Sequence, residues 1–183
     1  MLRKLLYYPH PNLKLISDEV GDGWAQSSEL KDLYADLAET MISNIGIGLA
    51  APQVDIPMRV FVMAVAKNSS RRNIVRESAR FNVQVFVDPV IEEHFDDLFT
   101  YEEGCLSVPG VTEEVQRWPQ IAVSAWDIES NQRLRFDLYG IEARCAQHEI
   151  DHLDGKMFTD GYGGVKRDIA KRKIKKFLRE ESR

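Results

Sequence analysis

Apolar residues recur at three- and four-residue intervals across residues 28–45, which is the period of a helix with one buried face. The apolar positions are Leu30, Leu33, Tyr34, Leu37, Met41, Ile42 and Ile45. Ser27 or Ser28 is suited to cap the start of this helix, and Gly46 is suited to end it. The spacing therefore predicts an N-terminal helix whose apolar face packs against a core.

Short apolar runs in the middle of the chain predict strands. Residues 58–66 and 83–87 have the length and composition of buried strands, and Pro89 is expected to stop the second one. Residues 67–82, which lie between them, begin with a polar, turn-rich run and show no clear period. This segment is therefore predicted to be a solvated loop.

Two later runs alternate between apolar residues and polar or small ones. Their apolar members are Ile121, Val123, Ala125, Leu134, Phe136 and Leu138. Because polar residues 129–132 separate the runs, we predict a hairpin with one buried face. Gly140 then opens a helix that Gly155 is suited to end, and a last helix begins near Val165.

Composition is that of an ordinary globular protein, with 44% apolar and 29% charged residues among 183. Residues 1–183 are therefore predicted to form a single domain. No apolar run is long enough to span a bilayer and residues 1–6 lack signal-peptide features, so we expect a cytoplasmic protein. In such a chain the two cysteines, Cys105 and Cys145, indicate reduced thiols or metal ligands.

Charge is distributed unevenly along the chain. The net charge is −5, yet residues 165–183 carry nine Lys or Arg against three Asp or Glu. This C-terminal basic helix is equally consistent with a solvated amphipathic helix and with a surface that binds a polyanion such as RNA.

The segment at 147–152 carries the strongest chemical pattern. His148 and His152 lie four residues apart, so on a helix they share one face and can close on a single metal ion. Glu149 lies beside them, and a Lewis acid with an adjacent general base is the apparatus of metal-assisted hydrolysis. The alternative is a helix with two ordinary histidines.

Two histidines need at least one further protein ligand. The candidates are Cys105, Cys145, Asp151 and Asp154. Cys145 lies on the same helix, seven residues or about 10.5 Å from His152, which is too far for its short side chain. Cys105 comes from a separate extended segment, where Gly104 allows a close approach. We therefore predict that Cys105, His148 and His152 bind the metal and that Cys145 lines the site.

Residues 46–53 taken alone indicate a tight connection between elements, or a site lined by their backbone and by the Gln53 amide. Three stretches together are more specific: GIGLAAPQ at 46–53, EGCLS at 103–107 and QHEIDHLDG at 147–155. They resemble the three signature motifs of the bacterial-type peptide deformylases and stand in the same order, and the similarity covers essentially the whole chain.

The resemblance implies an α+β fold, with antiparallel sheets packed around a central metal-binding HExxH helix, an N-terminal helix and a basic C-terminal helix. It implies a hydrolase that removes the formyl group from the N-terminal formyl-methionine of new polypeptides and releases formate. By the same resemblance, Cys105 and both histidines hold the metal, and Glu149 transfers the protons. The Gln53 side chain and the Leu106 backbone N–H stabilise the oxyanion.

The family resemblance also implies a cofactor, a substrate slot and a partner. The metal is expected to be Fe²⁺, with Ni²⁺, Co²⁺ or Zn²⁺ as alternatives. Ile47, Ile141 and Cys145 match positions near the pocket for the formyl-methionine side chain, although Ile141 also fits a plain core residue. The backbone of Gly48 and of the segment after Ser107 is expected to pair with the peptide. The basic last helix is expected to contact ribosomal RNA.

Some features depart from the pattern of the best-known bacterial members of the family. Thr112 stands where relatives often carry a peptide-contacting arginine, and residues 67–82 are longer than in the compact members. Glu103 and Arg117 are expected to form an ion pair that supports the site, with a surface role for Arg117 as the alternative. Two rival functions are an HExxH peptidase and a catalytically silent ribosome-binding or metal-binding protein.

Overall fold

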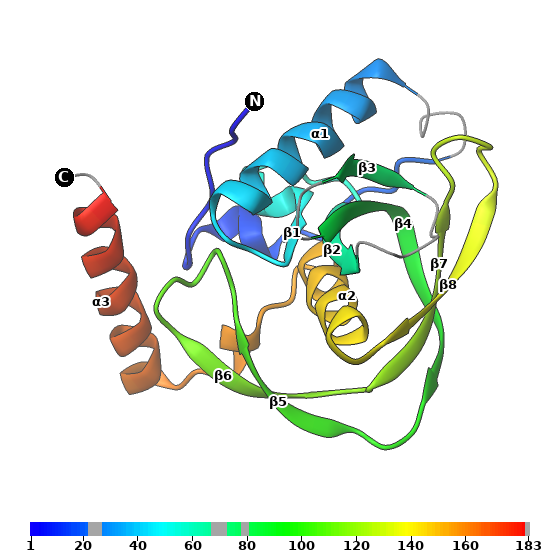
Figure 1. Cartoon of the computed structure of the whole chain (residues 1–183). Helices are drawn as coiled ribbons and strands as arrows, with labels where there is room; N and C mark the ends of the chain where they lie inside the picture. Colours follow the sequence, from blue (N-terminus) through cyan, green and yellow to red (C-terminus); the bar gives the residue numbers. More distant parts are fainter. Residues whose placement is uncertain (22–26, 67–72, 78–80, 182–183) are drawn as a thin grey trace.

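Antiparallel sheets and three helices make up the described part of the chain, which confirms the predicted α+β fold (Figure 1). The computed structural model describes residues 1–21, 27–66, 73–77 and 81–181. The helices are α1 (Ser28–Ser43), α2 (Gly140–Leu153) and α3 (Gly164–Glu181), with the 3-10 turns η1 (Pro11–Lys14), η2 (Ala51–Val54) and η3 (Phe158–Gly161).

The larger sheet has the strand order β1-β2-β4-β7-β8, and β3 also pairs with β4. A second, two-stranded sheet is formed by β5 and β6. The strands are β1 (Gly48–Ala50), β2 (Val60–Ala66), β3 (Ile74–Glu77), β4 (Phe81–Phe95), β5 (Phe99–Gly104), β6 (Thr112–Arg117), β7 (Gln120–Trp126) and β8 (Arg133–Tyr139). Among the described strands β1 pairs with β2 alone, so it forms one edge of the larger sheet.

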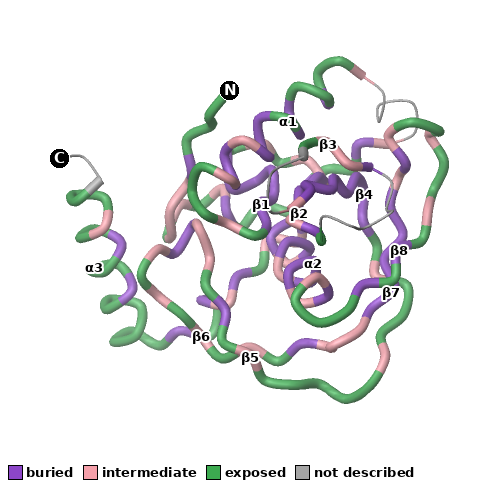
Figure 2. The backbone as a smooth tube through the Cα atoms, viewed as in Figure 1, coloured by how far each residue is buried: buried purple, intermediate pink, exposed green. Residues whose placement is uncertain are grey.

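The two faces of the larger sheet bury two hydrophobic clusters. Because side chains alternate along a strand, Val60 and Val62 of β2 pack with the apolar face of α1, whereas Phe61 and Met63 pack with α2. Phe61 also stacks on Phe86, with ring centroids 4.6 Å apart. α2 is therefore enclosed at the centre of the molecule, as its run of buried residues shows (Figure 2).

Several local predictions are confirmed. Ser27 caps α1, because its Oγ accepts from the backbone N–H of Leu30 at 3.1 Å. β7 and β8 form the predicted antiparallel pair, in which Ile121 lies opposite Leu138. Only β8 has the predicted single buried face, because β7 is buried on both faces. α2 begins at Gly140, and Gly155 follows its end with a φ of +68°.

The end of α1 differs from the prediction. Gly46 does not terminate the helix, because α1 ends at Ser43 with Asn44 as its C-cap, and Ile45 takes the left-handed conformation with a φ of 56°. Ile45 is also 93% exposed, so it does not belong to the core face that its spacing suggested. The apolar spacing therefore predicted a helix two residues longer than α1.

The predicted stop at Pro89 is also wrong. β4 continues through this residue to Phe95, because the pairing with β7 shifts register between Val87 and Val90, and a bulge tolerates a residue without an N–H. Within the predicted loop 67–82, β3 pairs with β4, so this part is not a solvated excursion. Residues 67–72 and 78–80 of that loop lie outside the described residues.

Candidate metal centre and active site

α2 carries the histidines and the glutamate of the HExxH pattern into the interior. The rings of His148 and His152 lie one turn apart, with centroids separated by 4.9 Å and planes at 83°. His152 and Glu149 are buried, and His148 is half-buried. The helix reaches this depth because it packs against β1, β2, β7 and β8.

Cys105, which follows the last residue of β5, completes a cluster of three metal-ligating groups. Its Sγ atom lies 3.2 Å from Nε2 of His152, and the ligand atoms of Cys105, His148 and His152 all lie within 4.8 Å of one another. Thiolate and imidazole groups suit zinc, iron, nickel and cobalt. The structure thus brings together the three residues that the sequence predicted as ligands.

The other candidate ligands have different partners. Asp151 forms an ion pair with Arg117, and Asp154 forms one with Arg59 at 2.9 Å. The Cys145 thiol is buried and donates to the backbone oxygen of Ile47 at 3.4 Å. Burial raises the pKa of this thiol well above its ordinary value, so Cys145 stays protonated.

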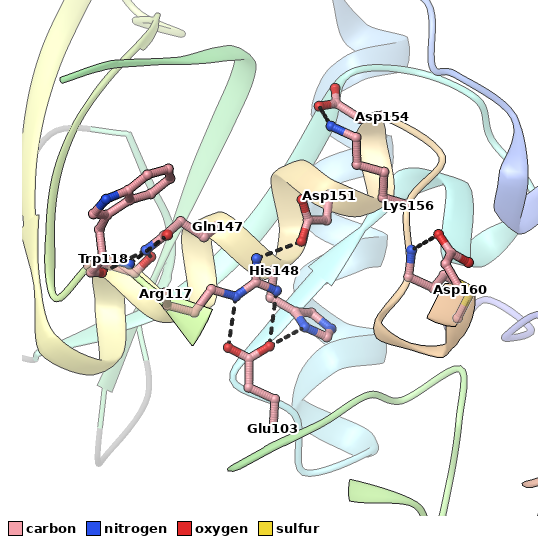
Figure 3. A network of polar contacts seen from close by, with 11 residues as sticks. Glu103, Arg117, Trp118, Gln147, His148, Asp151, Asp154, Lys156 and Asp160 are labelled. Atoms are coloured by element: carbon pink, nitrogen blue, oxygen red, sulfur yellow. Dashed lines mark hydrogen bonds and ion pairs between the residues drawn. The ribbon is translucent and has the colours of Figure 1, made fainter. Parts of the chain in front are cut away.

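A buried charge network orients the first histidine (Figure 3). Both carboxylate oxygens of Glu103 accept from Arg117, from Nε at 3.0 Å and from Nη2 at 3.1 Å. One of these oxygens also lies 3.0 Å from Nδ1 of His148, and Arg117 reaches Asp151 on α2 at 2.6 Å. With Nδ1 of His148 held in this way, its Nε2 is left to bind a metal.

This network sets the charge of Glu103. Burial alone would raise the pKa of its carboxyl, but the hydrogen bonds from His148 and Arg117 lower it to about 2. Glu103 is therefore ionised at neutral pH. The predicted ion pair is present, and the alternative surface role for Arg117 is wrong because the residue is buried. Asp151, the second carboxylate that Arg117 contacts, was not predicted as its partner.

The two histidines differ in their protonation. Burial holds the pKa of His152 well below its ordinary value, which keeps the imidazole neutral, as metal binding requires. Burial would also lower the pKa of His148, but its contacts with Cys105 and Glu103 raise it well above the ordinary value. An incoming metal ion would therefore displace a proton from the site.

Glu149 is a buried carboxyl next to this cluster. Its Oε2 atom has no hydrogen-bond partner among the described residues, and burial raises its pKa to about 7 although the nearby His148 lowers it. Gly48 of β1 packs directly on it, since a Cβ at that position would lie 2.4 Å from Oε1 of Glu149 and 2.6 Å from Sγ of Cys145. Only glycine therefore fits at position 48.

The Gln53 side chain, from η2, is fixed at both ends of its amide. Its Oε1 accepts from the N–H of Ala50 at 2.9 Å, while its Nε2 donates to Oγ of Ser107 at 3.1 Å and lies 3.6 Å from Sγ of Cys105. The amide donor is thus held beside the three candidate metal ligands. Leu106, which directly follows Cys105, lines the same cavity.

A cavity of about 440 Å³ opens onto the cluster. Its lining includes the predicted slot residues Ile47, Ile141 and Cys145, and also Gly48, which was predicted to pair with the peptide backbone, and Thr112. Ile47 is 50% exposed and Ile141 is 59% exposed, so the alternative of Ile141 as a core residue is wrong. Arg144 lines the cavity too, although it was not among the predicted site residues. Its position one helical turn before His148 is the signal that could have revealed it.

A thiol and two histidines gathered beside a buried carboxyl, at the base of an open cavity, define a metal-dependent hydrolase of the HExxH kind. The polypeptide deformylase family profile matches residues 2–168 of the chain. A peptide deformylase from Bradyrhizobium sp. (strain ORS 278) is 40% identical over 182 residues, covering 100% of this chain and 97% of the relative. One from Phenylobacterium zucineum is 39% identical, covering 96% of each.

Solved structures give the same result. The crystal structure of a peptide deformylase from Legionella pneumophila matches with a TM-score of 0.83 and 34% identity, over 100% of this chain and 99% of that one. That from Ehrlichia chaffeensis matches with a TM-score of 0.83 and 33% identity, over 100% of both chains. The chain belongs to the peptide deformylase family.

Membership in this family defines the activity. The protein is a metalloenzyme that hydrolyses the N-terminal formyl group of formyl-methionine on newly made polypeptides and releases formate. Among the described residues, no helix combines the length and the apolar character needed to cross a membrane.

Proposed function

We propose that Cys105, His148 and His152 hold one divalent metal ion in this protein, with Fe²⁺ as the native ion and Ni²⁺, Co²⁺ or Zn²⁺ as substitutes. The observation that carries the proposal is the convergence of these three side chains within 4.8 Å, with the remaining ring nitrogen of His148 engaged by Glu103. When bound, the ion supplies a Lewis acid that polarises the formyl group and makes water acidic.

Glu149 is the group that moves protons in this proposal. It accepts a proton from the attacking water and later delivers one to the leaving amine. Two properties support the role: the Oε2 atom, which no described residue engages in a hydrogen bond, and a pKa of about 7 that lets the carboxyl give and take a proton near neutral pH.

The Gln53 side chain and the Leu106 backbone N–H are the proposed donors to the oxyanion that forms on the formyl carbon. The amide of Gln53 is held by Ala50 and Ser107, so its donor end needs no reorientation during the reaction. A fixed donor of this kind stabilises developing charge more than a mobile one.

The cavity provides a place for the substrate. We assign the slot among Ile47, Ile141 and Cys145 to the formyl-methionine side chain. The peptide backbone would pair with Gly48 on the open edge of β1 and with the segment after Ser107, as an added strand. Backbone pairing makes few demands on the residues that follow the methionine, which suits an enzyme that acts on many nascent chains.

Replacing Cys105 with alanine tests the metal site. Protein purified without oxygen and titrated with Co²⁺ is expected to show thiolate-to-cobalt charge-transfer absorption, which the Cys105→Ala variant should lack. Cys145→Ala is the matched control, because its buried thiol lies outside the ligand cluster, and it should retain the absorption. Loss of the band in Cys145→Ala together with its survival in Cys105→Ala would contradict the ligand assignment.

We further propose that residues 1–183 act as a single domain in the cytoplasm and that α3 contacts ribosomal RNA. Its lysines and arginines from residue 166 to residue 179 are exposed. Lys171, Lys175 and Arg179 lie along one side of α3 and line a groove with Tyr8 and Pro9. A basic groove of this kind fits the phosphate backbone of RNA.

Charge reversal on α3 tests this contact better than truncation, because removing residues from 171 onward would also remove the buried Ile174. Lys171→Glu with Lys175→Glu is expected to weaken ribosome binding at least about tenfold and to reduce its salt dependence, with hydrolysis of short formyl-peptides intact. Lys173→Glu with Lys176→Glu, which lie outside the groove lining, is the matched control. Ribosome affinity that is unchanged in the groove variant would contradict the contact.

A further inference from the structure

Among the described residues that line the cavity, one carries a positive charge that the proposed mechanism does not use. Arg144 of α2 lines the same cavity as His148 and Glu149. It lies one helical turn before the candidate ligand His148 and three residues after Ile141. Along α2, Arg144 therefore lies between the metal ligands and the apolar part of the slot at Ile141.

Arg144 is held in place by the neighbouring strand. Side chains two residues apart share one face of a strand, so Tyr101 and Glu103 of β5 both point toward α2. They are about 6.6 Å apart along β5, which matches the rise of about 6 Å between Arg144 and His148 on the helix. Glu103 contacts His148 at 3.0 Å, and the Arg144 guanidinium lies 4.2 Å from the centre of the Tyr101 ring.

The Arg144 guanidinium does not use all of its hydrogen-bond donors in contacts with the described residues. Of its five N–H donors, one on Nη2 reaches the backbone oxygen of Glu102 at 3.2 Å. The Nε atom is buried and has no partner among the described residues. Burial closes Nε to a ligand, but the Nη donors other than the one that Glu102 accepts can meet an acceptor in the cavity, where a hydrogen bond from a charged donor adds affinity.

We propose that Arg144 is a specificity-determining residue, which makes the slot selective for a first side chain of methionine length that carries a hydrogen-bond acceptor near its end. This inference rests on the proposed placement of the first side chain in the slot. It extends the substrate class to peptides that begin with formyl-methionine sulfoxide. Oxidation turns the weakly accepting thioether into a strong acceptor, which a purely apolar slot would reject.

Three formyl-peptides that differ only in the first residue separate these cases: methionine, methionine sulfoxide and norleucine. Norleucine has a similar length and carries no acceptor. The measured quantity is kcat/KM for each peptide, and the informative value is the ratio of sulfoxide to norleucine. In the Arg144→Leu variant this ratio is expected to fall about tenfold or more, because a hydrogen bond from a charged donor is lost.

Two further variants test how Arg144 is positioned. Tyr101→Leu removes the ring under the guanidinium, so its sulfoxide-to-norleucine ratio should fall between those of the wild type and Arg144→Leu. Tyr101→Phe keeps the ring, so its ratio should equal that of the wild type. Arg135→Leu is the matched control, because Arg135 pairs with Glu93 and Asp137 on an exposed part of the sheet, and its ratio should equal that of the wild type.

The Ile141→Ala variant tests separately whether the first side chain of the peptide binds in the slot. If Ile141→Ala changes discrimination among the three peptides and Arg144→Leu leaves the sulfoxide-to-norleucine ratio at the wild-type value, the role of Arg144 is overturned and the slot stands. If neither variant changes any ratio, the first side chain does not bind in this slot, and the inference is overturned with it.

Discussion

Replacing Glu149 with glutamine is expected to lower kcat for formyl-peptide hydrolysis by about 10²–10⁴-fold, which is the usual contribution of a positioned general acid and base. Glutamine has the shape of glutamate and still fits against Gly48, but it cannot accept and return a proton. Because Glu149 lies outside the cluster of three ligating groups, the variant should retain its metal ion.

Parallel measurement of kcat, metal content and melting temperature checks this prediction. Glu142→Gln is the matched control, since Glu142 lies on the same helix two turns earlier, where its carboxylate accepts from the N–H of Ala66 at 3.4 Å. Its kcat should equal that of the wild type. A Glu149→Gln variant that keeps its metal and more than about a tenth of the wild-type kcat would exclude Glu149 as the proton-transfer group.

Replacing Arg117 with methionine is expected to lower the free energy of unfolding by about 3–5 kcal/mol, because it leaves the buried carboxylate of Glu103 without its main partner. For a chain of this length the melting temperature should fall by roughly 6–20 °C. Metal affinity should also fall by about 10–100-fold, since Glu103 orients His148.

The loss of stability should depend on pH. Because the pKa of Glu103 is lowered from 4.5 to about 2, its ion pair stabilises the wild type above about pH 4.5 and loses this effect as the pH falls toward 2. The gap between wild type and Arg117→Met should narrow over the same range.

Arg135→Met provides the matched control for this prediction. Arg135 also pairs with two carboxylates, Glu93 and Asp137, but these pairs are exposed, so solvent screening leaves them little effect on stability. Equal melting temperatures for Arg117→Met and Arg135→Met would show that the buried network does not stabilise the fold.

The sequence was most informative where one rule of local geometry decided the outcome. The four-residue spacing of His148 and His152 fixes a shared helix face, and the alternation in β8 fixes which of its side chains point to the core. The reach of a cysteine side chain along a helix favoured Cys105 over Cys145 as the third member of the cluster. These arguments need no knowledge of distant contacts.

Predictions failed where a contact between distant segments overrode the local pattern. Pro89 was predicted to stop the strand, yet the bulge between β4 and β7 accommodates it. This bulge depends on the pairing with β7, which the local sequence around Pro89 does not contain. β3 has no clear period of its own and forms because β4 offers it an edge. Arg144 appears as an ordinary helix-surface arginine until Tyr101 on β5 is placed beneath it.

The most direct test of the central claim is hydrolysis of a formyl-Met-Ala peptide by protein purified without oxygen, with formate and free amine followed together and the unformylated peptide alongside. We predict that formate and the new amine appear in equal amounts, that the Met-Ala bond stays intact and that Met-Ala alone is not cleaved. Cleavage of the Met-Ala bond would instead identify a peptidase, and no reaction with iron, nickel, cobalt or zinc supplied would identify a binding protein that keeps only the fold.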